Sequence, residues 1–269
     1  MTIFNIKDFN TKLLVDFSNH AIYSSPFRGE TLSSCVVFEK NKKKYLYAKS
    51  VVGFSEKEAY VAALKEKLAL SIYSFFGIVV PETKILRLPI IWSHPYYTNA
   101  LFGLAESRIY TYYICSNILK LNHCLKIRLP NEKALGAILA VGVLINDIDV
   151  LGNQFKNVGY INKNPFHWVK IDAGEAFSTI DIKHTLNKIQ FCTQGKQVYL
   201  ERNKLPPKVR NEFNFVLEKI SSINPQEFEL ILKENLNDEE SNELFFNDSD
   251  ILSTVMVFLA ERIRYIKDN

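Results

Sequence analysis

Alternating apolar and polar positions early in the chain predict a pair of strands. Residues 34–39 (SCVVFE) and 44–49 (KYLYAK) are short runs rich in β-branched and aromatic residues, the side chains that favour strands. The polar segment 40–43 between them contains Asn41, a residue typical of tight turns. We therefore expect a β-hairpin over 34–49.

A long helix is predicted next, from about residue 55 to residue 76. Ser55 with Glu58 three residues later has the pattern of a capping box. Gly77 and Pro81 then end the helix, because glycine suits a helix C-terminus and proline cannot continue it. Apolar residues at helical spacing predict its buried face: Leu64, Leu68, Ile72 and Phe75.

The rest of the pattern predicts a few more strands and then mainly helices. Since strands dominate the first part and helices the second, we expect an α+β fold of two lobes, residues 1–115 and residues 116–269. The expected strands are 84–92, 108–115, 158–161 and 167–172, the last two around a turn. The expected helices are 131–146 and 249–266, within a region that is helical from about Pro206 and in which Asn224 and Pro225 begin a helix.

Composition narrows the class of protein. Of the 269 residues, 47% are apolar and 23% are charged, which is the balance of a globular protein. The net charge of +4 lacks the basic excess of a nucleic-acid binder, so we expect no nucleic-acid partner. We also expect no membrane span or signal peptide, since no apolar run approaches about 18 residues. The four widely spaced cysteines predict reduced thiols and a cytoplasmic setting.

The polar stretch 146–157 is the first candidate for chemistry, because it follows a predicted buried helix. It contains Asp147 and Asp149, and Asp172 ends the later strand before a glycine turn. Oxygen ligands of this kind suit Mg²⁺, which is usually shared with substrate phosphates. Asp147 has a second interpretation, as an ordinary cap of the preceding helix.

A lysine and a glutamate complete the candidate set. Lys49 ends the second strand of the predicted hairpin, where its ammonium could contact phosphates. Glu66 on the following helix is the expected partner that orients Lys49, with Glu58 as the alternative.

In this order, the residues resemble the motifs of atypical kinases, namely the HipA-like and phosphatidylinositol 3/4-kinase-like branch of the protein-kinase-like fold. The resemblance implies that Lys49 contacts the ATP phosphates and that Glu66, eleven residues before the glycine of GIVVPE, holds this lysine. It further implies that Asp149 of INDID is the catalytic aspartate. Asn157 of KNVGY and Asp172 of KIDAG would then bind the metal.

Two departures from the family pattern are visible. Seven residues separate Asp149 from Asn157, more than the family commonly has, so either the loop carries an insertion or Asn153 is the ligand. No glycine-rich phosphate loop is present. The segment SSPFRGETLSS, with Gly29, stands in its place and could cradle phosphate through backbone N–H groups.

The resemblance implies an ATP- and Mg²⁺-dependent phosphotransferase of bilobal, protein-kinase-like fold. A protein Ser/Thr hydroxyl is the preferred acceptor. A phosphoinositide is the alternative, disfavoured because the segment after Asp172 starts acidic. A pseudokinase that binds nucleotide or a partner without transfer is the second class of function. The resemblance also fits a bacterial toxin-type kinase or an effector that works in a host cytosol.

Overall fold

The structure of the chain is a computed structural model. It describes residues 13–24, 34–51, 56–89, 110–119, 121–122, 129–152, 155–161, 167–177, 188–193, 196–236 and 248–269. The chain forms two compact units. The first falls within Met1–Leu64 and Glu82–Leu119, and the second within Lys65–Pro81 and Lys120–Asn269.

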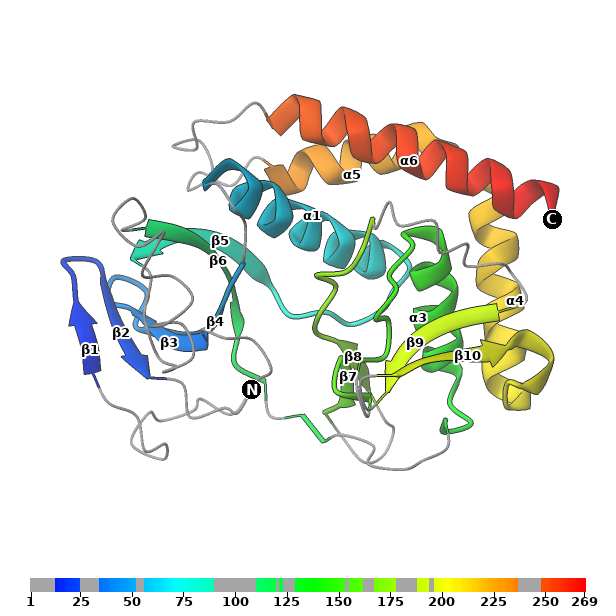
Figure 1. The fold of residues 1–269 in the computed structure, drawn as a ribbon, viewed down its shortest axis with the longest axis horizontal. Coiled ribbons are helices and arrows are strands. Elements are labelled where there is room, and N and C mark those ends of the chain that lie inside the picture. Colours follow the sequence, from blue (N-terminus) through cyan, green and yellow to red (C-terminus); the bar gives the residue numbers. More distant parts are fainter. Residues whose placement is uncertain are drawn as a thin grey trace. The chain divides into compact units, whose positions relative to one another are not determined.

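An antiparallel sheet of six strands forms the first unit, in the order β1-β2-β3-β4-β6-β5 (Figure 1). The hairpin of β3 and β4 has the predicted position, with Ser34 opposite Lys49 and Glu39 opposite Lys44. The strands are β1 (Leu13–Asp16), β2 (His20–Ser24), β3 (Ser34–Glu39), β4 (Lys44–Ser50), β5 (Thr83–Pro89) and β6 (Tyr110–Asn117).

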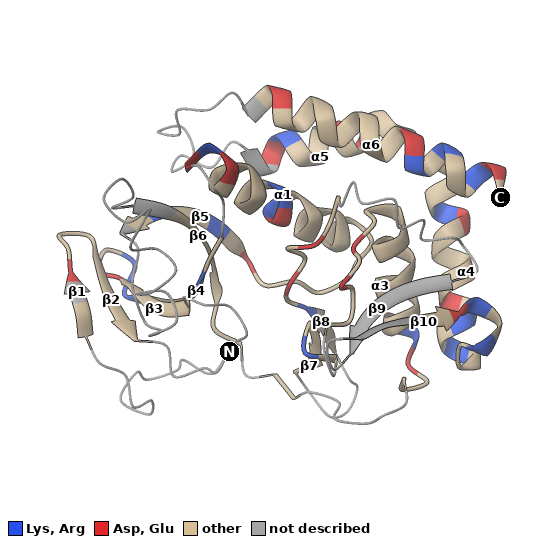
Figure 2. Ribbon diagram, viewed as in Figure 1, with Lys and Arg blue, Asp and Glu red and all other residues tan. Residues whose placement is uncertain are grey.

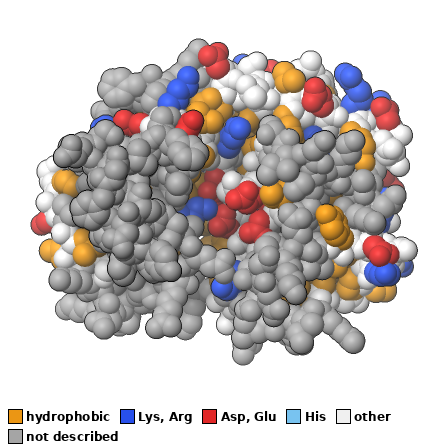
Figure 3. All heavy atoms as spheres, viewed as in Figure 1, with side chains coloured by type: hydrophobic (Ala, Val, Ile, Leu, Met, Phe, Trp, Pro, Cys, Tyr) orange, Lys and Arg blue, Asp and Glu red, His pale blue; other side chains and the backbone are white. Residues whose placement is uncertain are grey.

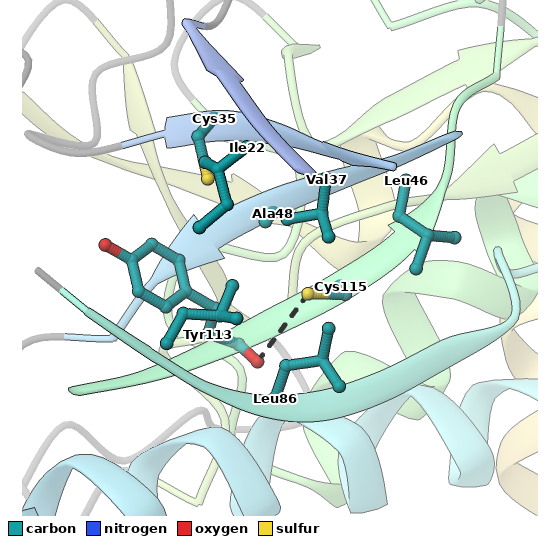
Figure 4. Packing of buried hydrophobic residues seen from close by; sticks show 9 residues of the cluster. Ile22, Cys35, Val37, Leu46, Ala48, Leu86, Tyr113 and Cys115 are labelled. Atoms are coloured by element: carbon teal, nitrogen blue, oxygen red, sulfur yellow. Dashed lines mark hydrogen bonds between the residues drawn. The ribbon is translucent and has the colours of Figure 1, made fainter. Parts of the chain in front are cut away.

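One face of this sheet is a continuous apolar core (Figure 4). Side chains alternate between the two faces of a strand, so every second residue contributes to the core. The Cys115 thiol lies 4.0 Å from the backbone carbonyl of Tyr113, within this cluster. The buried members are Ile22, Cys35, Val37, Leu46, Ala48, Leu86, Leu88, Tyr113 and Cys115.

The opposite face of the sheet carries Lys49 and packs against the start of α1 (Glu56–Phe75). Lys49 pairs with Ile114 across β4 and β6, so it shares a face with Tyr112, two residues before Ile114. The Tyr112 ring lies 5.2 Å from the ring of Tyr60 on α1. Lys49 therefore lies on the helix-covered face, where its side chain is half-buried.

The end of α1 follows from its sequence. Gly77 adopts a φ of +75°, a left-handed conformation that glycine adopts without steric strain. Its N–H donates to the Ser74 carbonyl at 2.8 Å, and the Ile78 N–H donates to the Tyr73 carbonyl at 3.1 Å. This pair of bonds is a Schellman motif. Gly77 is the C-terminal cap that the sequence predicts.

The second unit is mainly helical and also contains two small hairpins (Figure 1). Helix α3 packs against α4 and β8, and α5 packs against α6. Asn224 caps α5, because its Oδ1 accepts from the Gln226 N–H at 3.2 Å. The elements are α3 (Lys133–Leu144), β7 (Val158–Tyr160), β8 (Trp168–Lys170), β9 (Lys188–Thr193), β10 (Lys196–Glu201), η4 (Arg202–Lys204), α4 (Pro207–Ser222), α5 (Pro225–Leu236) and α6 (Asp248–Asp268).

The α+β prediction is confirmed, with a strand-rich first part that includes one long helix and a mainly helical second part. Two features differ from the expected pattern. The sheet has two additional strands at its start, β1 and β2, and a second hairpin, β9–β10, follows β8. In the part of the chain that the structure describes, no helix is both long enough and apolar enough to span a bilayer.

Candidate active site

The loop that carries the predicted catalytic residues begins with a left-handed turn at the end of α3. Asn146 adopts a φ of +48°, which asparagine tolerates better than most residues. The Asn146 N–H faces the Val143 carbonyl at 3.4 Å, and the Asp147 N–H donates to the Gly142 carbonyl at 2.9 Å. This is the bond pattern of a second Schellman motif. The turn directs Asp147 into the protein, where only 1% of its side chain is exposed.

Asp147 is the centre of a buried polar network. Its Oδ2 accepts from the Tyr73 hydroxyl at 2.9 Å and pairs with Nζ of Lys170 at 3.1 Å. Its Oδ1 accepts from the backbone N–H of Asp149 at 3.2 Å. The Asp147 backbone closes the helix, as a cap would, while its carboxylate binds a tyrosine, a lysine and the next part of the loop.

Tyr73 and Lys170 are fully buried in this network. Burial raises the pKa of the Tyr73 hydroxyl well above its usual value, and the neighbouring Asp147 carboxylate adds to the rise. Tyr73 therefore stays protonated and serves as a hydrogen-bond donor. A buried carboxylate requires a paired charge, which Lys170 supplies.

Asp149, the predicted catalytic aspartate, is held by Asn157. The Nδ2 of Asn157 donates to the Asp149 backbone carbonyl at 2.8 Å and to its Oδ2 at 3.0 Å. Both Asp149 atoms are acceptors, which fixes the orientation of the Asn157 amide. The other carboxylate oxygen, Oδ1, is buried and has no hydrogen-bond partner among the described residues.

Burial, and after it the neighbouring carboxylate of Asp147, are the main causes that raise the pKa of the Asp149 carboxyl to about 6. Lys170 and the hydrogen bond from Asn157 act in the opposite direction, and Asp172 makes a smaller contribution that raises it. Asp149 is therefore a proton acceptor whose affinity for a proton exceeds that of an ordinary aspartate. Its charge is only partly compensated by its neighbours.

Gly152 allows the lengthened loop to bring Asn157 next to Asp149. It adopts a φ of +71°, and a methyl group there would lie 2.5 Å from Cγ of Asn157. The backbone carbonyl of Asn157 accepts from the Ile171 N–H at 3.1 Å, which ties this residue to the segment before Asp172. Of the two candidate asparagines, Asn157 contacts Asp149, and Asn153 lies outside the described residues.

Asp172 follows β8 in the turn that the sequence predicts. Its Oδ1 accepts from the Gly174 N–H at 3.0 Å, and its backbone carbonyl accepts from Nζ of Lys170. The turn then returns to the end of α3, since the Phe177 N–H donates to the Ile145 carbonyl at 2.7 Å. Figure 2 shows acidic residues on the two loops that follow α3 and β8, with a basic residue on β8.

The side chains of this region include few metal ligands for the predicted Mg²⁺. Among the residues that the structure describes, no group of three or more His, Cys, Asp and Glu side chains is placed to hold a metal. The predicted ligands, Asp172 and Asn157, form a smaller set. Mg²⁺ accepts such a set because it keeps waters and substrate phosphates in its shell. The Oδ1 of Asp149, which is buried without a hydrogen-bond partner among the described residues, fits a cation. Figure 3 shows acidic side chains on the face in view.

The predicted residues of the first part of the chain are divided between the two units. Lys49 belongs to the first unit, whereas Glu66 is buried on the part of α1 that belongs to the second. Their pairing stays a prediction, as does the alternative with Glu58, whose side chain is exposed in the first unit. Gly29 lies outside the described residues.

Sequence reasoning missed Lys170 and Tyr73. A signal for Lys170 was available, because the lysine sits inside the apolar run of HWVKID. A charged side chain in a buried strand requires a buried counter-charge. Nothing in the spacing of Tyr73 separates it from the other core residues of α1.

No family model matches the chain, and no curated protein matches it at a significant level. The solved structures similar to it include that of the Helicobacter pylori proinflammatory kinase CtkA. The TM-score is 0.49 and the sequence identity 14%, over 90% of this chain and 91% of that chain.

Proposed function

We propose that the chain is an ATP- and Mg²⁺-dependent phosphotransferase. The proposal rests on one observation: Asn157 is hydrogen-bonded to Asp149. The pair lies close to Asp172, within the second unit. Phosphoryl transfer requires a carboxylate for the acceptor hydroxyl and oxygen ligands for a metal. These residues provide both kinds of group from two neighbouring loops.

Asp172 and Asn157 would hold Mg²⁺, and Asp149 would act on the acceptor hydroxyl. Bound Mg²⁺ supplies positive charge that stabilises the phosphates. Asp149 orients the hydroxyl and takes its proton, for which the pKa of about 6 suits an ionised base at neutral pH. Lys49 would contact the nucleotide phosphates, with Glu66 as its orienting partner.

The acceptor we propose is a Ser or Thr hydroxyl of a protein. Glu175 is exposed in the turn directly after Asp172, where a negative charge would repel an anionic lipid head group. A peptide hydroxyl carries no such charge. A phosphoinositide acceptor is therefore the less favoured substrate.

Transfer of the γ-phosphate from labelled ATP tests this function, with protein acceptors and the chain itself as substrates. Asp172→Ala should lower the rate by at least about 10²-fold, since it removes a metal ligand. Asp250→Ala, at an exposed aspartate of α6, is the matched control and should retain full activity.

Full activity of Asp172→Ala would contradict the site. Absence of transfer by the wild-type chain would contradict the function. A rise in melting temperature with ATP and Mg²⁺ but without transfer would indicate a nucleotide-binding pseudokinase.

A further inference from the structure

Lys170 carries a charge in the interior of the second unit. All three positions of β8 are buried, and the Lys170 side chain is 0% exposed. Burying an ammonium is unfavourable unless it is paired and hydrogen-bonded. The partners of Lys170 therefore indicate what the residue does.

The ammonium of Lys170 has oxygen partners on two different loops. It pairs with Oδ2 of Asp147, in the loop after α3, at 3.1 Å. It also donates to the backbone carbonyl of Asp172, in the turn after β8. The ring of Tyr73, from the last turn of α1, lies 5.5 Å from the same nitrogen. One charged group thus joins three segments that are distant in the sequence.

Asp147 extends this link to Asp149. Its second oxygen accepts from the Asp149 backbone N–H at 3.2 Å, while the Asp149 backbone carbonyl accepts from Asn157 at 2.8 Å. Both backbone groups of Asp149 are therefore bonded to side chains. A continuous chain of bonds runs from Asp149 through Asp147 and Lys170 to Asp172.

We infer that Lys170 is a positioning residue, whose ammonium sets the spacing between the catalytic loop and the metal-binding turn. The inference rests on the proposed function, because it concerns the residues that would carry transfer. Lys170 touches neither the acceptor nor the nucleotide in this role. It acts through Asp147 and through the backbone of Asp172.

A role in stability alone would not require this pair. Buried ion pairs are often replaced by uncharged residues with little loss of stability. The geometry of a reacting site is more demanding, since a displacement of about 1 Å can lower a rate by about 10²-fold. A variant that removes both charges together separates the two roles.

The double variant Lys170→Met with Asp147→Asn provides this test. Asparagine keeps an oxygen for the Asp149 N–H, while the link to Asp172 is lost. We expect a melting temperature close to that of the wild type and a kcat about 10²-fold lower per folded molecule at saturating Mg²⁺, with little change in KM for ATP. Wild-type kcat in a folded double variant would overturn the inference.

If the double variant does not fold, a single variant tests the positioning role of Lys170. Lys170→Arg keeps the charge for Asp147 but carries a longer, planar head group, which would displace the two loops. A reduced kcat at the wild-type melting temperature supports the positioning role. Wild-type kcat in this variant overturns it.

Binding of Mn²⁺, followed by electron paramagnetic resonance, separates this inference from the proposed function. If the wild-type chain binds Mn²⁺ but transfers no phosphate, the proposed phosphotransferase function is wrong. The positioning role of Lys170 is then tested by comparing the Mn²⁺ affinities of the wild type and the double variant. At least tenfold weaker binding by the folded variant supports the inference, and equal binding overturns it. Absence of Mn²⁺ binding by the wild-type chain overturns both.

Discussion

At the scale of single residues, Asp147 and Asp149 are close in sequence but have opposite surroundings. The Asp147 carboxylate has a tyrosine, a lysine and a backbone N–H as donors. The Asp149 carboxylate has one donor side chain, and its Oδ1 is buried without a partner in the described part of the chain. Loss of the charge at these two positions should therefore change stability in opposite directions.

Asp149→Asn should stabilise the chain while it lowers kcat by at least about 10²-fold. The raised pKa means that the folded state disfavours the ionised carboxylate. This penalty is absent below the unfolded pKa and is complete above pH 6, so the gain in melting temperature should be larger at pH 8 than at pH 5. Calorimetry at both pH values measures it, and a variant less stable at pH 8 would contradict the prediction.

Asp147→Asn is the matched comparison. It leaves the buried Lys170 without a charged partner, which typically costs about 3–5 kcal/mol. Urea unfolding at pH 8 should show a lower midpoint for this variant. Equal stability of the two asparagine variants would mean that the surroundings of the carboxylates do not differ as described.

Cys35 offers a separate test in the core of the sheet. Burial raises the pKa of its thiol to about 12, and the thiolate is the form that reacts. We expect iodoacetamide to leave Cys35 unmodified in the native chain at pH 8 and to modify it after unfolding in urea. Mass spectrometry locates the label, and rapid native modification would contradict the burial.

At the scale of elements, two glycines with left-handed backbone conformations can be compared directly. Gly77 and Gly152 have φ values of +75° and +71°. A methyl group at Gly77 would have nothing within 4 Å, whereas one at Gly152 would lie 2.5 Å from Asn157. A side chain at Gly77 would therefore cause backbone strain only. A side chain at Gly152 would also collide with Asn157, a candidate metal ligand.

Gly77→Ala should therefore lower stability by about 1–2 kcal/mol through strain alone, with little effect on kcat. Gly152→Ala should lower stability more and should also lower kcat, because Asn157 must move away from Asp149. Denaturant unfolding and kinetics on both variants check this. Equal effects on kcat would contradict a specific role for the loop around Asn157.

The elements with strong periodicity or clear end signals were predictable. The hairpin of β3 and β4 and the end of α1 at Gly77 follow from local chemistry. The hairpin of β9 and β10, in which Thr193 pairs with Lys196, was missed, although the sequence between these two residues is Gln-Gly and a glycine between two strand-like runs is a hairpin signal.

The candidate site divides in the same way. Asp149 and Asp172 were candidates because they lie in loops after predicted buried elements, and Asn157 was added by the resemblance to atypical kinases; their roles stay predictions. The partnership of Lys170, Asp147 and Tyr73 was not predictable, since it joins three elements that only the fold brings together.

At the scale of the whole molecule, the proposed function requires residues from both units. Lys49 lies in the first unit and Asp172 in the second. If both act in one reaction, Lys49→Met and Asp172→Ala should each lower kcat by at least about 10²-fold, and the double variant should be little worse than the more severe single variant.

Single-turnover kinetics on the three variants measure this coupling. Lys57→Met, at an exposed lysine of α1, is the control and should behave as the wild type. Fully additive losses from Lys49 and Asp172 would contradict their action in one reaction centre.

The burial of Lys170 has a consequence for the proposed metal site when no metal is bound. If the site binds Mg²⁺ as proposed, that ion can dissociate, whereas Lys170 is part of the polypeptide and is enclosed by it. One positive charge therefore stays beside the aspartates when a chelator removes every divalent cation. The chain should keep its fold in such a chelator, and the proposed transfer activity should return as soon as Mg²⁺ is added back, without refolding.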